Sequence, residues 1–329
     1  MERYGGVRLS HRPWQEIQGC YLSAFVSPPS DATRQIFASP ADLDRYEAKI
    51  GKQLAISMVF LAWGHPGHLA PFPEKWATEM QQRRTVPHIT WEPWDFDKYC
   101  QHYRNPKIVA GAWDDYIRSW AVAVRNWGHP IFFRWGHEMN AHWYPWAGGI
   151  CPAGPQAFVA AFRHIVKIFR SEAADNVIWV WSPDTAIFSS QSPPFKYEPY
   201  YPGSDVVDWI AFDGYNFAQD SDATKPWVPF SDLYGDIYQR CQDLHPTAPF
   251  MIGEFACGEK GGSKAEWIRD AFQVIKTRMP RIKAVTWFDI DKESHWPVDS
   301  SPQALAAFRQ AISDPYFIGK QASPQIWTI

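Results

Sequence analysis

Eight nearly continuous apolar runs alternate with amphipathic segments along the chain, and this alternation constrains the fold more than any other feature. The apolar runs lie at 17–25, 53–63, 85–94, 130–138, 177–184, 207–216, 249–256 and 282–290. Short runs of this kind are typical of parallel strands buried on both faces. The clearest helical patterns lie at 113–128, 154–174, 230–245, 263–279 and 302–313. Eight strands alternating with about seven helices predict an α/β fold, a single (β/α)8 TIM barrel.

A doubly wound open sheet is the alternative architecture for such a pattern. Its usual mark is a glycine-rich turn after the first strand, but residues 25–29 read Phe-Val-Ser-Pro-Pro. No low-complexity stretch or linker divides the 329 residues, and α/β barrels often exceed the usual domain length. The sequence therefore predicts one domain over residues 1–329.

Aromatic residues make up 16% of the chain, with 19 Trp, 14 Tyr and 21 Phe. We expect the surplus rings on surfaces after the strands, where flat rings bind sugars, bases or apolar partners. A net charge of −3 without a basic stripe argues against a nucleic-acid partner. No apolar window is long enough for a transmembrane helix, and the first six residues contain no apolar segment. We therefore expect no membrane partner, and no signal peptide in this chain.

The cysteines and histidines do not predict a metal or cofactor site. The five cysteines are scattered and show neither a disulfide framework nor zinc-ligand spacing. His137 and Glu138 with His142 resemble a zinc-protease motif, but the second histidine follows five residues after the first instead of four. A barrel enzyme for phosphorylated metabolites would need a glycine-rich phosphate site, and the loop 256–262 is a poor match. We expect no metal and no cofactor.

Polar residues are concentrated at the ends of the predicted strands, which is where a TIM barrel builds its active site. A charged residue that ends an apolar strand is costly unless it points into a polar site. Glu138 follows the fourth strand and Glu254 follows the seventh, and strands three places apart face each other across the barrel mouth. Retaining glycoside hydrolysis requires two carboxyl groups about 5–5.5 Å apart, one as acid/base and one as nucleophile. The pair therefore indicates a glycosidase.

Four segments carry a resemblance to a known family. The stretch IFFRWGHEMNAHWYPW resembles the fourth-strand motif of glycoside hydrolase family 26, and FMIGEFA resembles its seventh-strand motif. YYPGSDVVDWIAFDGYN and AVTWFDIDKESHW are similar to its sixth- and eighth-strand segments. This family contains β-mannanases and lichenases, in a clan of retaining TIM-barrel glycosidases. The similarity extends from about the second strand to the C-terminus.

The resemblance implies roles for individual residues. Glu138 would be the acid/base and Glu254 the nucleophile. Tyr215 would hydrogen-bond Glu254, while Arg134 and His137 would position the carboxylates and the sugar. The remaining implied contacts are Trp287 as the floor of the subsite before the cleaved bond and Trp143 across the mouth.

The third strand departs from the mannan-cleaving members of the family, which commonly end it with Trp-His. Here Trp91 is followed by Glu92, and we expect both near the substrate. The change favours mixed-linkage β-glucan over mannan. For Glu92 a substrate contact and a loop ion pair are both open.

Together these features predict a retaining endo-β-glycanase that hydrolyses a β-1,4-containing polysaccharide by double displacement. Mixed-linkage β-1,3-1,4-glucan is the favoured substrate, and an endo-β-1,4-mannanase of the same family is the alternative. A non-catalytic carbohydrate-binding barrel is the alternative from another class. We expect a monomer that is secreted or periplasmic, given its substrate class.

Overall fold

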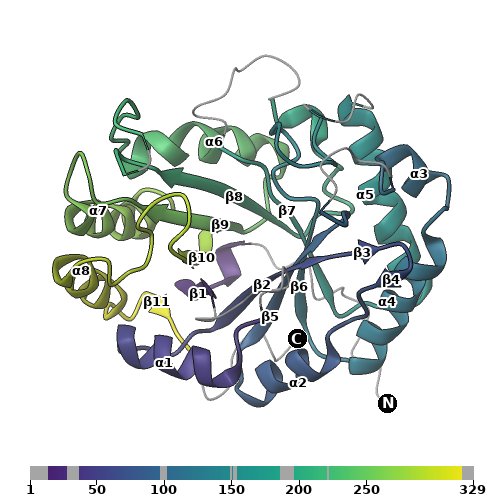
Figure 1. Cartoon of the computed structure of the whole chain (residues 1–329), viewed down its shortest axis with the longest axis horizontal. Helices are drawn as coiled ribbons and strands as arrows, with labels where there is room; N and C mark the ends of the chain where they lie inside the picture. The colour runs from purple at the N-terminus through teal and green to yellow at the C-terminus, as the bar shows by residue number, and fades with distance from the viewer. Residues whose placement is uncertain are drawn as a thin grey trace.

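The computed structural model describes residues 14–27, 37–96, 102–148, 150, 154–185, 196–220 and 222–320. Eight parallel strands form a ring, which closes where the first strand pairs with the last (Figure 1). The strands are β1 Cys20–Val26, β2 Ile56–Ala62, β5 Val86–Glu92, β6 Ile131–Trp135, β7 Val177–Trp181, β8 Trp209–Asn216, β9 Phe250–Cys257 and β10 Ile282–Asp289. The (β/α)8 prediction is confirmed, and each strand lies within about three residues of its predicted bounds.

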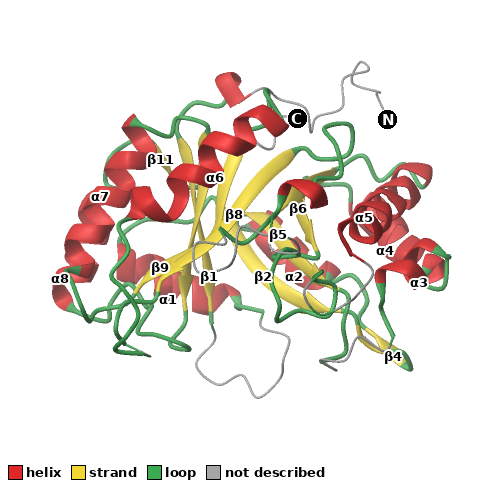
Figure 2. Ribbon diagram, turned by 90° about the horizontal axis from the view of Figure 1, so that it is seen from above, coloured by secondary structure: helices red, strands yellow, loops and turns green. Residues whose placement is uncertain are grey.

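Helices surround this ring and cover the outer faces of the strands (Figure 2). They are α1 Pro40–Ile50, α2 Glu74–Gln82, α3 Asn105–Val109, α4 Asp114–Trp127, α5 Gly154–Ser171, α6 Phe230–Leu244, α7 Lys264–Thr277 and α8 Pro302–Ile312, with short 3-10 helices η2 Trp14–Glu16 and η3 Glu198–Tyr200. A small hairpin, β3 Gly64–His65 with β4 His68–Leu69, follows β2, and β11 Phe317–Ile318 pairs with the start of β1. None of the described helices is long and apolar enough to cross a membrane.

The aromatic surplus lies in the core, so the expectation that it lies on surfaces is wrong. Among the described residues, the large exposed apolar side chains are Val109 and Trp143. Trp91 illustrates the rest: it is fully buried, with its ring centroid 4.7 Å from that of Trp120 and 5.2 Å from that of Phe133. A barrel has a second core between its outer surface and the helices, and large rings fill that layer.

Trp120 is a test of this outer core. Its side chain is fully buried, and its Nε1 donates a hydrogen bond to the carbonyl of Ala70 at 2.9 Å. Trp120→Ala should lower the free energy of unfolding by about 3–5 kcal/mol, because it leaves a cavity and removes one of the two hydrogen bonds that the Ala70 carbonyl accepts. Trp143→Ala, at a ring that is 41% exposed, should cost less than about 1 kcal/mol. Equal urea midpoints for the two variants would contradict this placement.

Candidate active site

The carboxyl ends of the barrel strands bring polar side chains together inside the mouth. Side chains on a strand alternate between its two faces, so residues two apart point the same way. On β5 and β6, Thr90 pairs in register with Arg134. A register shift between β8 and β9 pairs Asp213 with Glu254. Inward-facing side chains at the carboxyl ends of four strands, β5, β6, β8 and β9, therefore form one polar cluster.

Arg134 lies at the centre of this cluster and is fully buried. Its Nη1 donates to Oδ1 of Asp213 at 2.8 Å, and its Nη2 donates to Oε1 of Glu254 at 2.6 Å. Its Nε donates to the Thr90 hydroxyl at 2.9 Å, and Ser182 donates to the other oxygen of Asp213 at 2.7 Å. A buried guanidinium is tolerable only with such partners. One cation therefore binds two carboxylates and fixes where they point.

Glu254 is held through both of its oxygens. Arg134 occupies Oε1, and the hydroxyl of Tyr215 donates to Oε2. Burial, and then the neighbouring Glu254 carboxylate, raise the pKa of Tyr215 well above its usual value, so the phenol keeps its proton. Glu254 is 4% exposed and lies at the barrel mouth as an oriented carboxylate. This arrangement suits a nucleophile.

Glu138 lies in a different environment. Its backbone adopts a left-handed conformation with φ of 51°, and its N–H donates to the Ser182 carbonyl at 2.7 Å. Nε1 of Trp143 donates to its Oε2 at 2.6 Å. Burial, and then the Glu254 carboxylate, raise the pKa of Glu138 well above its usual value. Because Arg134 pairs with other carboxylates, burial favours the protonated form of Glu138, which suits this group to act as an acid.

His137 lies beside the oriented carboxylate. Its Nε2 is 3.1 Å from the Tyr144 hydroxyl and 3.9 Å from Oε1 of Glu254. Burial and the nearby Arg134 lower the pKa of His137 well below its usual value. The imidazole is therefore neutral and can exchange hydrogen bonds without adding charge.

Glu92 is a buried carboxyl group at the end of β5, near Glu254 and Arg134. Nε1 of Trp94 donates to its Oε2 at 3.3 Å. Glu92 makes no salt bridge within the described part of the chain, so the loop ion pair is wrong there. Burial raises the pKa of Glu92 to about 8, and the group is a neutral acid at pH 7.

Two predicted substrate contacts do not reach the mouth. Trp91 and Trp287 are fully buried on the outer side of the barrel. The Trp287 ring packs 5.0 Å from Phe255 and 5.2 Å from Phe308, centroid to centroid. Since neighbours on a strand face opposite sides, the inward residues are Glu92 and Phe288. The predicted floor made by Trp287 is therefore wrong.

Asp213 is one member of the cluster that sequence reasoning did not assign, as are Thr90 and Ser182. It stands two residues before Tyr215 on the same strand, so the period of two could have placed both on the inner face. Trp143 donates its Nε1 hydrogen to Glu138, and its contact with the sugar across the mouth stays a prediction. In the described residues, no group of three or more His, Cys, Asp or Glu side chains is arranged to hold a metal ion.

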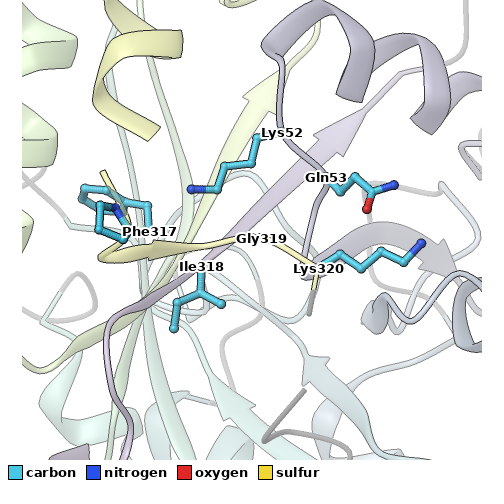
Figure 3. Close-up of a pocket in the computed structure, with 7 residues that line it drawn as sticks. Lys52, Gln53, Phe317, Ile318, Gly319 and Lys320 are labelled. Carbon is cyan, nitrogen blue, oxygen red and sulfur yellow. The ribbon is translucent and has the colours of Figure 1, made fainter. Parts of the chain in front are cut away.

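A separate pocket of about 260 Å³ lies at the opposite end of the barrel (Figure 3). Lys52, Gln53 and Phe317 line it, together with Ile318 and Lys320. Because β11 pairs with the first residues of β1, this pocket lies at the amino ends of the strands. It is not part of the carboxyl cluster.

Comparisons with known proteins show the family of this chain. The family model described as glycosyl hydrolase family 26 matches residues 49–236. Endoglucanase H of Acetivibrio thermocellus is 34% identical over 277 residues, which are 83% of this chain and 29% of that protein. Mannan endo-1,4-beta-mannosidase A and B of Caldalkalibacillus mannanilyticus is 27% identical over 199 residues, covering 57% of this chain and 34% of that protein. The chain spans about a third of the length of these curated relatives.

Solved structures show the same fold. The catalytic domain of a Bacillus sp. JAMB-750 GH26 endo-beta-1,4-mannanase aligns with a TM-score of 0.69 at 15% identity, over 98% of this chain and 94% of that one. An endo-beta-1,4-mannanase double mutant from Cellulomonas fimi aligns with a TM-score of 0.68 at 16% identity, over 96% and 75% of the two chains. At these identities the likeness concerns the fold alone.

The state of Glu92 predicts a pH-dependent stability. A carboxyl group whose pKa rises from 4.5 to about 8 on folding stabilises the native state fully below pH 4.5 and progressively less up to about pH 8. Glu92→Gln removes this loss, because glutamine cannot ionise. Its melting temperature relative to the unmodified chain should rise by a few degrees between pH 4.5 and pH 8. Glu74→Gln, at an exposed position on α2, is the control and should show no such trend. A constant difference across this range would contradict a buried neutral Glu92.

Proposed function

The chain belongs to glycosyl hydrolase family 26, and on that premise we propose that it is a retaining endo-β-glycanase for β-1,4-containing polysaccharides. The observation that carries the proposal is the difference between its two buried glutamates. Glu254 is an oriented carboxylate between Arg134 and Tyr215, whereas Glu138 is a carboxyl group held by Trp143 whose raised pKa favours the protonated form. Double displacement requires one group in each of these states.

The first step forms a glycosyl ester. The Glu254 carboxylate attacks the anomeric carbon, and the bond to the leaving oxygen breaks while Glu138 gives its proton to that oxygen. Tyr215 and Arg134 hold the attacking carboxylate until the new bond forms. Trp143, the large exposed ring beside Glu138, can contact the departing sugar.

The second step hydrolyses the ester. Once Glu254 is esterified its charge is lost, and the electrostatic contribution that raised the pKa of Glu138 is lost with it. Glu138 then accepts a proton from water, whose oxygen attacks the anomeric carbon and releases Glu254 as a carboxylate. The product keeps the β configuration because two inversions have taken place.

We infer mixed-linkage β-glucan as the preferred backbone. Glu92 stands at the mouth as a neutral acid that can donate to a sugar hydroxyl, and the relative matched over most of this chain is named an endoglucanase. Mannan is the second candidate, because other curated relatives and several structural neighbours are named mannanases. Polymers of either kind are met outside the cytoplasm, so we infer that the enzyme acts there.

Glu254→Ala tests the catalytic proposal. The variant should lose at least roughly 10⁴-fold in kcat on the best substrate, because no nucleophile remains, and should still bind oligosaccharide. Glu266→Ala, the same change at an exposed position of α7, should keep full activity. Reducing-sugar release and isothermal calorimetry measure the two quantities. Unimpaired hydrolysis by Glu254→Ala would overturn the proposal, and a chain that binds sugar but never hydrolyses it would be a carbohydrate-binding barrel.

Substrate choice and stereochemistry need a separate measurement. Barley-type β-glucan should be hydrolysed faster than glucomannan and galactomannan, with β-anomeric product seen first by proton NMR. Faster cleavage of galactomannan would assign the mannanase alternative and leave the mechanism intact. An α-anomer as the first product would overturn the retaining mechanism.

A further inference from the structure

The loop between β10 and α8 places a tryptophan ring behind the residue that holds Glu254. Trp296 is buried and stacks on Tyr215, with ring centroids 4.4 Å apart and planes 16° from parallel. Tyr215 in turn donates to Oε2 of Glu254. Any shift of the Trp296 ring is therefore transmitted to the phenol and to the carboxylate that it orients.

Lys264 holds the backbone on both sides of that ring. Its Nζ donates to the carbonyl of His295 at 2.6 Å and to the carbonyl of Pro297 at 2.9 Å. Its third hydrogen bond goes to the Ser300 hydroxyl at 2.8 Å. These are all the donors that an ammonium group has. The ammonium thus fixes the residues immediately before and after Trp296.

The rest of the loop is attached independently of Lys264. The Ser294 hydroxyl donates to Asp220 at 2.7 Å, and the N–H of Val298 donates to Asp289 at 2.7 Å. Removing the ammonium would therefore leave the loop connected at both flanks. Without the ammonium, the backbone around Trp296 would be held less precisely.

The position of Lys264 is electrostatically costly. It is the first residue of α7, after the N-cap Ser263, where the helix dipole disfavours a positive charge. It is also 1% exposed, and burial lowers its pKa to about 8. A cation kept in such a place indicates a compensating gain. The loop contacts are the gain that the structure offers.

We propose that Lys264 is a positioning residue for catalysis, which sets the orientation of Glu254 through Trp296 and Tyr215. This inference rests on the proposed function, because it takes Glu254 to be the nucleophile. A nucleophile that is displaced by a fraction of an ångström attacks more slowly although substrate still binds. Loss of the ammonium should therefore lower kcat and leave KM nearly unchanged.

A double-mutant cycle separates this role from simple stabilisation. Lys264→Met should lower kcat about 10-fold and change KM less than about 2-fold, measured well below the melting temperature of each variant. In a Tyr215→Phe background, where the hydroxyl that reaches Glu254 is gone, the same substitution should have almost no further effect on kcat. Lys276→Met on the same helix, at a side chain 41% exposed, is the matched control and should leave kcat unchanged.

An aryl glycoside with a good leaving group, such as a 2,4-dinitrophenyl oligosaccharide of the preferred sugar, gives a second readout. Glu138→Ala should lose little of its rate for glycosyl-ester formation on this probe, because the leaving group needs no proton. Lys264→Met should remain slow, since attack by Glu254 is still impaired. If Lys264→Met does not fold, Lys264→Gln keeps amide donors without the charge and takes its place in the cycle.

The outcomes are distinct. The positioning role would be overturned if Lys264→Met lowered kcat equally in the Tyr215 and the Tyr215→Phe backgrounds. It would also be overturned if Lys264→Met left kcat unchanged, or if the variant reacted at the normal rate with the aryl glycoside. In each of those cases the proposed function stands if Glu254→Ala is inactive. Hydrolysis by Glu254→Ala would instead overturn the proposed function itself, and the positioning role of Lys264 with it.

Discussion

The buried guanidinium of Arg134 is the constraint on which the rest of the site depends. The mouth of the barrel holds four buried carboxyl groups. Arg134 forms ion pairs with two of them, Asp213 and Glu254. Among the residues that the structure describes, Glu92 and Glu138 form no salt bridge, and burial favours their neutral forms. The choice of partners by one side chain therefore decides which carboxyl groups are ion-paired and which are not.

The same alternation that turns Arg134 inward explains where the aromatic rings lie. Every strand contributes alternate residues to the inner barrel and to the layer beneath the helices. At the end of β5, Glu92 faces the mouth and Trp91 faces α4. At the end of β10, Phe288 faces inward toward Tyr215, and Trp287 packs under α8. The abundance of tryptophan therefore reports a thick outer core more than a sugar-binding surface.

This division also explains what could be predicted from the sequence. The eight strands were predictable because burial on both faces leaves long apolar runs, and the glutamates were predictable because charge stands out at the ends of such runs. The side of the sheet on which an individual residue lies was not predictable. In a strand that is buried on both faces, inward and outward residues are both apolar, so the sequence shows no period of two, as at Trp287. Contacts such as that between Lys264 and the carbonyl of His295 join segments whose closeness follows only from the packed barrel. No local pattern marks them.

In a site with this arrangement of charges, the protonation of the carboxyl groups can change during the proposed reaction without movement of the chain. When Glu254 becomes an ester, Arg134 keeps Asp213 as its ionic partner, so the buried cation remains compensated. Glu138 at the same moment loses its strongest repulsive neighbour, so it can stay ionised after giving its proton to the leaving oxygen and can then accept a proton from water. Asp213 thus has a physical reason to be present although it need not touch substrate. Because Asp213 remains paired with Arg134, Glu254 can lose and regain its negative charge while the guanidinium that orients Glu254 stays in place.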